Sequence, residues 1–187
     1  MSVRAHPVDA RQHLLTALLV AAGCLALALR ASVVGSSAAV PIFVAILAAL
    51  AVVSIATPVG TDVHRLPTPL VVALGIAAVL AATVVTGRGM PLPSGALVLV
   101  LGVAAAVSEE LFFRRLIYGR LESIHPMVAV VGSALLFALV HVPLYGLPVF
   151  WVDLGAGLLF SWQRWASGGW GASAGTHALA NIMAVIR

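Results

Sequence analysis

Apolar residues form long runs along this chain, and the runs are separated by short stretches rich in proline, glycine and arginine. A helix needs roughly 20 apolar residues to cross a bilayer. Runs near this length predict about seven membrane-spanning helices, at residues 12–29, 38–57, 69–86, 95–113, 126–144, 147–162 and 170–186. The prolines and glycines between the runs oppose helix continuation. We therefore predict an all-α fold, a polytopic transmembrane helical bundle.

Composition supports a membrane protein over a water-soluble domain. The 187 residues are 62% hydrophobic and their mean hydropathy is +1.14, which leaves too little polar surface to cover a soluble fold. The single cysteine excludes an intrachain disulfide. We find neither an internal repeat nor a soluble domain. The alanine- and arginine-rich composition favours a bacterial source.

The positions of the arginines predict the orientation of the bundle. All ten basic residues are arginines, and a cytoplasmic N-terminus puts seven of them on the cytoplasmic side, namely Arg4, Arg11, Arg65, Arg114, Arg115, Arg120 and Arg164. The other side then holds three, namely Arg30, Arg88 and Arg187. This asymmetry obeys the positive-inside rule, so we expect a multi-pass protein of the inner (plasma) membrane with its N-terminus in the cytoplasm. The net charge of +4 then needs no nucleic-acid partner. The N-terminus also resembles a signal peptide, but the later spans favour a retained first helix.

Two of the six acidic residues, Glu109 and Glu110, are adjacent at the end of an apolar run. Glu110 and Arg114 are four residues apart, so they share a helix face and can form an ion pair. Glu109 points about 100° away from Glu110. The alternative interpretation is that both glutamates lie at the membrane interface and are neutralised by the neighbouring arginines.

Two further spans carry polar stripes at a spacing of four residues, which puts each stripe on one helix face. The stripes are Ser133, Phe137 and His141 in the fifth span, and Ser173, His177 and Asn181 in the last. A single histidine near a helix end is more often structural than catalytic. Polar groups in hydrocarbon nevertheless face the bundle interior or a water-filled cavity, because an unpaired polar group there is costly.

Considered together, these residues predict a polar catalytic cavity between the fourth, fifth and last spans. Its members are Glu109, Glu110, His141, His177 and Asn181, and we find no other plausible polar partners for them. A carboxylate, two imidazoles and a carboxamide are the groups needed to split an amide with water. A carboxylate or imidazole takes the proton, and N–H groups stabilise the oxyanion.

The three motifs resemble those of a known family. The segments EELFFR (109–114), FALVH (137–141) and HALAN (177–181) match the patterns EExxxR, FxxxH and HxxxN in that order. They are similar to the family of type II CAAX prenyl endopeptidases and bacteriocin-processing enzymes, called CPBP or Abi. The resemblance covers roughly residues 70–187. We therefore divide the chain into N-terminal spans and a linker, 1–68, and a CPBP-type intramembrane protease core, 69–187.

The resemblance implies an intramembrane endopeptidase. Glu109 would activate the hydrolytic water with the help of His141, and His177 and Asn181 would stabilise the oxyanion. Glu110 would be a supporting residue paired with Arg114. Phe137 is the first residue of the FxxxH motif and would support the site.

Metal dependence and function class stay open at this point. We expect no cofactor, but Glu109, His141 and His177 would be the ligands if the enzyme used zinc. The alternatives to an endopeptidase are a non-catalytic immunity or scaffold protein and a small proton-coupled transporter. The expected partners are a protein or peptide substrate and the lipid bilayer. Asp153 and Gln163 in the sixth span either line the mouth of the cavity or lie at the interface, and four tryptophans around the last two spans predict an interfacial belt.

Overall fold

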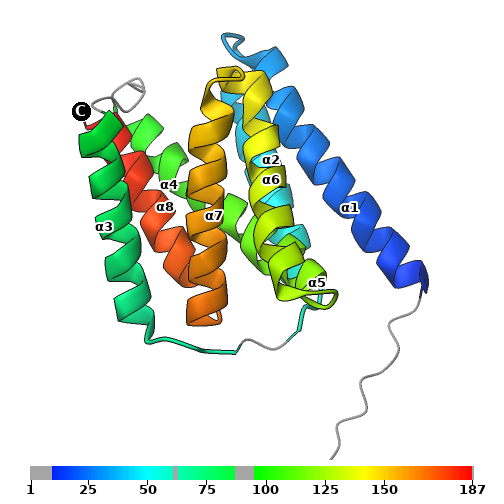
Figure 1. Ribbon diagram of the computed structural model, residues 1–187. Coiled ribbons are helices and arrows are strands. Elements are labelled where there is room, and N and C mark those ends of the chain that lie inside the picture. The colour runs from blue at the N-terminus through cyan, green and yellow to red at the C-terminus, as the bar shows by residue number, and fades with distance from the viewer. Residues whose placement is uncertain (1–9, 61–62, 87–94, 187) are drawn as a thin grey trace, which may run out of the picture.

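A computed structural model describes residues 10–60, 63–86 and 95–186 (Figure 1). All regular structure in these ranges is helical. The elements are α1 (Ala10–Leu29), η1 (Arg30–Val33), α2 (Ala39–Ala56), α3 (Thr68–Thr86), α4 (Ala96–Glu110), η2 (Leu111–Ile117), α5 (Tyr118–Glu122), α6 (Pro126–Tyr145), α7 (Val149–Ser167) and α8 (Gly171–Val185). The predicted all-α fold is therefore confirmed, and each predicted span has a helix close to its expected bounds.

The helices form one bundle in which α1 and α3 are the outer members (Figure 1). The most extensive contact is between α6 and α7, and α8 packs against α4, α3 and α7. The two N-terminal helices complete the bundle, because α1 packs on α6 while α2 packs on α4 and η2. The start of α1 and the C-terminal end of the chain lie at opposite ends of the bundle (Figure 1). The predicted segments 1–68 and 69–187 are thus in direct contact.

Two predicted spans end too early: the sixth, 147–162, because α7 continues to Ser167, and the fourth, 95–113. The helix does not stop after the two phenylalanines but continues as the π-helix η2 and the short α5 to Glu122. Arg114 is consequently not on the cytoplasmic face, because it is fully buried inside the bundle. Arg30, expected on the opposite face, is buried as well. Arg4, Arg88 and Arg187 lie outside the described residues.

Four helical segments of the described chain are long and apolar enough to cross a membrane. They are Arg11–Val33, Ala39–Ala56, Ala96–Glu122 and Pro126–Tyr145, and Thr68–Val84 is a shorter apolar helix. The helices of two other predicted spans are not long and apolar enough to cross a membrane, for different reasons. α7 carries Asp153 and Arg164, and the 15 residues of α8 are fewer than the roughly 20 that span a bilayer. The chain is a helical membrane bundle, and the count of seven spans stays a prediction.

Polarity in this bundle is reversed with respect to a soluble protein. Large apolar side chains cover the outside, and α1 alone exposes Leu14, Leu15, Leu18, Leu19, Leu25 and Leu29. The charged side chains of Glu109, Glu110 and Arg114 are buried. Hydrocarbon tails solvate the outer leucines, whereas each charge in the interior needs a partner from the protein.

The interior consists of an aromatic core and a smaller polar junction. The core contains four phenylalanines among Leu27, Leu50, Phe112, Phe113, Leu116, Ile117, Phe137, Val140 and Phe160. The junction is built on Gln163, whose amide nitrogen donates to the backbone oxygen of Val71 at 3.1 Å and to Oγ1 of Thr176 at 2.8 Å. Gln163 therefore joins α3, α7 and α8, and it lies neither at the cavity mouth nor at the interface.

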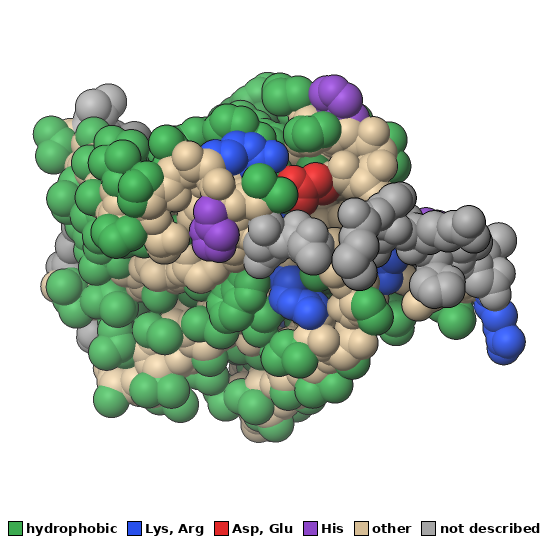
Figure 2. All heavy atoms as spheres, turned by 90° about the horizontal axis from the view of Figure 1, so that it is seen from below, with side chains coloured by type: hydrophobic (Ala, Val, Ile, Leu, Met, Phe, Trp, Pro, Cys, Tyr) green, Lys and Arg blue, Asp and Glu red, His purple; other side chains and the backbone are tan. Residues whose placement is uncertain are grey.

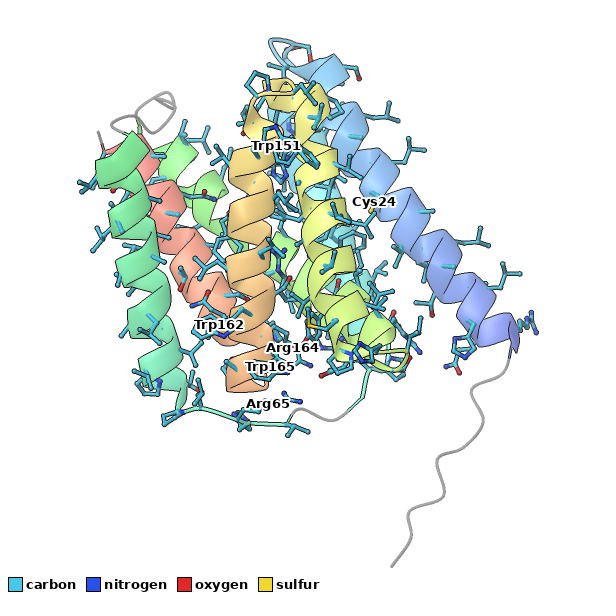
Figure 3. The ribbon with its side chains drawn as sticks, in the orientation of Figure 1. Cys24, Arg65, Trp151, Trp162, Arg164 and Trp165 are labelled. Carbon is cyan, nitrogen blue, oxygen red and sulfur yellow. The ribbon has the colours of Figure 1, made fainter. Side chains whose placement is uncertain are left out.

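The connection between α2 and α3 is attached to the end of α7. The backbone N–H groups of Arg65 and Leu66 donate to the oxygen of Ala166 at 3.0 and 2.9 Å. The guanidinium of Arg65 lies 4.8 Å from the ring centroid of Trp165, and its Nη1 donates to the oxygen of that residue at 2.7 Å (Figure 3). Trp162 lies near the same end of α7, whereas Trp151 lies at the other end (Figure 3). The arrangement of the tryptophans at two levels is compatible with the predicted belt.

The closest approach of α6 and α7 predicts a position where bulk is not tolerated. A Cβ atom on Gly157 would lie 3.0 Å from the Cα and O atoms of Ala134, and backbone atoms cannot rotate away. We expect Gly157→Ala to lower the free energy of unfolding by about 1–3 kcal/mol, as overpacking usually does. Gly155→Ala is the control, because a Cβ at that position meets nothing within 4 Å. Thermal unfolding in detergent micelles measures both, and equal melting temperatures for the two variants would contradict this prediction.

Candidate active site

The site begins where α4 changes into a π-helix. Glu109 and Glu110 are the last residues of α4, and η2 starts at the next residue. A π-helix has a backbone hydrogen-bond pattern that differs from that of the α-helix, and it often occurs at functional sites. Here the hydroxyl of Ser133 in α6 donates to the backbone oxygen of Phe113 at 2.8 Å, which gives the widened turn a partner from a neighbouring helix. The π-helix was not predicted, because nothing in the residue pattern distinguishes it from an α-helix.

The two adjacent glutamates have separate surroundings, as their angular separation predicts. Glu109 is 3% exposed, and its Oε1 accepts a hydrogen bond from Nη1 of Arg30 at 2.9 Å. Its other oxygen, Oε2, lies 3.7 Å from Nε2 of His141. This separation is too long for a direct hydrogen bond, but it allows one water molecule to bond to both atoms.

His141 is oriented by its own helix and by an aromatic neighbour. Its Nδ1 lies 2.7 Å from the backbone oxygen of Phe137, and a carbonyl oxygen only accepts, so we assign the Nδ1 proton to this bond. In the neutral imidazole, Nε2 then presents its lone pair toward Glu109. Tyr145 stacks on the His141 ring at a centroid distance of 6.1 Å. Oδ2 of Asp153 lies 3.9 Å from Nδ1.

Glu110 connects an arginine and a histidine from different helices. Its Oε2 lies 3.3 Å from Nε of Arg114, which confirms the predicted pairing at four residues' separation. Its Oε1 lies 3.1 Å from Nδ1 of His177 in α8. Glu110 is fully buried and therefore contacts no solvent. The second glutamate thus fixes the ring orientation of His177 rather than facing the cavity.

Aromatic rings surround the buried guanidinium and both imidazoles. The Phe137 ring is 4.6 Å from the guanidinium carbon of Arg114, 4.7 Å from the His141 ring and 5.6 Å from the His177 ring. Phe160 stacks on His177 at 4.9 Å. Nη2 of Arg114 also donates to the backbone oxygen of Gly157 at 3.1 Å. Phe137 therefore contacts three members of the site, and its supporting role stays a prediction.

Asn181 is bonded to the helix opposite it. Its Nδ2 donates to the backbone oxygen of Gly102 in α4 at 2.9 Å, and the side chain lines the cavity. This bond uses one of the two N–H groups of the amide, so the other is available to a ligand. Ser173, at the start of the same predicted stripe, bonds the oxygen of Trp170 and does not line the cavity.

A cavity of about 320 Å³ joins these residues. Its polar lining is Arg30, Glu109, His141, Asp153, His177 and Asn181. Its apolar lining includes Phe43, Val98, Leu101, Ala105, Phe137 and Tyr145. The fourth, fifth and last predicted spans contribute to it, as predicted, and so do η1, α2 and α7. The cavity is large enough for a short segment of peptide and holds a carboxylate, two imidazoles and a carboxamide on its wall.

Two polar residues of the cavity, Arg30 and Asp153, are not among the predicted site residues. Arg30 was interpreted only as an indicator of topology, although it is the closest partner of Glu109. The two residues are 79 positions apart, so no local spacing connects them. Of the two interpretations of Asp153, the structure supports the one in which it lines the cavity. An acidic residue inside an apolar run was the available signal for it.

The expectation about metal stays a prediction. The described residues contain no group of three or more His, Cys, Asp or Glu side chains arranged to hold a metal ion. Two atoms of the predicted zinc set already have partners, since Oε1 of Glu109 bonds Arg30 and Nδ1 of His177 bonds Glu110. Oε2 of Glu109 and Nε2 of His141 are not used by these bonds.

The fold and the site together define a helical membrane protein with a buried glutamate–histidine centre. Residues 91–183, about half of the chain, match the family described as type II CAAX prenyl endopeptidase Rce1-like. All three sequence motifs lie within these residues. The match places residues 91–183 in this family and supports a role of the intramembrane CAAX protease type. Comparison with curated proteins and with solved structures gives no match.

Proposed function

We propose that this protein is an intramembrane endopeptidase in which Glu109 and His141 activate a water molecule for attack on a peptide bond. The observation that carries the proposal is the separation of 3.7 Å between Oε2 of Glu109 and Nε2 of His141 on the wall of the cavity. A water held between these atoms donates one hydrogen to each. Family membership supports a protein or peptide as the substrate.

The reaction that we propose proceeds by addition and elimination. Glu109 accepts a proton from the water as its oxygen attacks the carbonyl carbon of the scissile bond. The resulting oxyanion receives hydrogen bonds from the free N–H of Asn181 and from Nε2–H of a doubly protonated His177, whose Nδ1–H donates to Glu110. Protonated Glu109 then gives its proton to the leaving amine as the C–N bond breaks. The cycle returns every group to its starting state and consumes one water.

The roles of the two glutamates differ because their partners differ. Glu109 faces the cavity and shares only one of its oxygens with Arg30. Both oxygens of Glu110 are near protein partners, Arg114 and His177, and the side chain is fully buried. Only Glu109 has an oxygen available to water, so we assign it the role of base and assign Glu110 the role of support.

The first test compares a variant with its matched neighbour. Purified protein in proteoliposomes is screened against an internally quenched peptide library, and one cleaved member is kept as the reference peptide. Glu109→Gln preserves the shape of the side chain but removes the base, so we expect kcat to fall by about 10²-fold or more. Full activity of Glu109→Gln, or activity lost only in Glu110→Gln, would contradict the assignment. A scaffold or a transporter would cleave none of the peptides even as wild type.

The second test concerns metal. The proposed reaction uses only side chains and water, so dialysis against a strong chelator should leave cleavage of the reference peptide unchanged. Activity is measured before and after chelation, with the metal content determined in parallel. Loss of activity that one equivalent of zinc restores would instead support the alternative with Glu109, His141 and His177 as ligands.

We also propose that the N-terminus is cytoplasmic and that the cavity opens toward the opposite side of the membrane. Arg11, Arg65 and Arg120 lie at the end of the bundle where α1 begins, and arginine and histidine side chains are visible on that end (Figure 2). The cavity lies toward the other end, because its lining includes Arg30 after α1 and Tyr145 at the end of α6. The positive-inside rule then assigns the cavity mouth to the extracytoplasmic side.

Cysteine labelling tests this orientation. Cys24 is the only cysteine and is half-buried, so Cys24→Ala provides the background. Ile124→Cys is placed in the α5–α6 connection and Leu147→Cys in the α6–α7 connection, where the native side chains are 72% and 69% exposed. A membrane-impermeant maleimide should label Leu147→Cys in intact cells and Ile124→Cys only after permeabilisation. The reverse pattern would show an extracytoplasmic N-terminus.

A further inference from the structure

The closest charged partner of Glu109 comes from outside the family-matched part of the chain. Arg30 begins η1, directly after α1, whereas the family match covers residues 91–183. Its side chain is 7% exposed, and Nη1 donates to Oε1 of Glu109 at 2.9 Å. An arginine buried between apolar helices has few ways to be stabilised, so a contact of this length to a carboxylate is a strong structural constraint.

The remaining surroundings of Arg30 do not compete with this contact. Its guanidinium carbon lies 5.8 Å from the ring centroid of Phe43, and its Nε has no hydrogen-bond partner among the described residues. Tyr145 and Asp153 line the same cavity. The only hydrogen bond that the described chain gives to the Arg30 side chain is therefore the one to Glu109.

The contact also decides which oxygen of Glu109 can act. Arg30 occupies Oε1, and this bond limits rotation of the carboxylate about its last side-chain torsion. Oε2 is thereby directed toward Nε2 of His141. Without Arg30, the carboxylate would be free to rotate, and its charge would have no arginine of its own, because Arg114 is already paired with Glu110.

We infer that Arg30 is a positioning residue for the proposed hydrolysis, which holds Glu109 charged and oriented for the attacking water. This inference rests on the proposed function of Glu109. It also implies that residues 91–183 do not make a complete site, since η1 supplies Arg30. Arg30 itself does not touch the reacting atoms and acts only through Glu109.

The kinetic test uses the full-length protein and the reference peptide. Arg30→Gln should lower kcat at least about tenfold while KM changes less than about threefold, because misorientation of a reacting group affects the chemical step more than binding. Arg30→Lys should restore part of the loss, since it keeps the charge without the planar guanidinium. Arg115→Gln is the matched control. Arg115 also joins two helices, through the backbone oxygens of Ser54 and Thr57, but it does not line the cavity.

A stability measurement covers the case in which Arg30→Gln folds poorly. Removing Arg30 leaves a buried, unpaired carboxylate, so the melting temperature in detergent should fall by several degrees. Arg30→Gln combined with Glu109→Gln should recover most of this loss, because neither charge is then left alone. Equal losses in the single and double variants would show that Arg30 has a general structural role and would overturn the inference.

The outcomes separate this inference from the proposed function. An inactive Glu109→Gln with an unchanged kcat for Arg30→Gln would overturn the positioning role and leave the proposed function standing. A fully active Glu109→Gln would overturn both. A low kcat for Arg30→Gln, partial recovery in Arg30→Lys and normal activity in Arg115→Gln would establish Arg30 as a positioning residue.

Discussion

The structure depends on the rule that a charge inside an apolar bundle needs an opposite charge beside it. Transfer of an ion from water into a low-dielectric interior costs several kcal/mol, and removal of one partner of a buried pair costs about 3–5 kcal/mol. Glu109 and Glu110 are both buried, and each has its own arginine, Arg30 and Arg114. The two ion pairs form on different faces of one helix, so both adjacent carboxylates can be charged and buried. If they shared a single arginine, one carboxylate would have no compensating charge.

These polar contacts also determine which helices meet. Apolar side chains give little preference among neighbours in a bilayer, since lipid tails solvate them equally well, and association relies on close packing and interhelical hydrogen bonds. Arg30 connects the end of α1 to α4, and Glu110 connects α4 to α8 through His177. Arg114 connects η2 to α7 through the backbone oxygen of Gly157, the glycine that allows α7 to approach α6. The residues that we assign to catalysis and its support are therefore also those that hold the bundle together.

The contacts that join the helices also explain why the two glutamates have different roles. Glu110 is fully buried, with one oxygen beside His177 and the other in ion-pair contact with Arg114, so it can orient a neighbour but does not face the cavity. Glu109 retains one oxygen on the cavity wall. The π-helix that follows the two glutamates contributes to the site through Arg114. It brings Arg114 under the ring of Phe137, where the guanidinium lies between aromatic faces and the backbone of α7.

The sequence by itself determined the features that depend on local pattern. The helical runs follow from hydropathy, the pairing of Glu110 with Arg114 follows from helical periodicity, and the motif residues Glu109, His141, His177 and Asn181 follow from their spacing and family resemblance. The tertiary structure decided what depends on distant segments. Arg30 contacts Glu109 across 79 positions, and Glu110 contacts His177. Asn181 donates a hydrogen bond to Gly102, and the fourth helix extends to Glu122. The physical reason is that the partner of a buried polar group is chosen by the packing of whole helices, and that choice leaves no periodic signal in the residues near it.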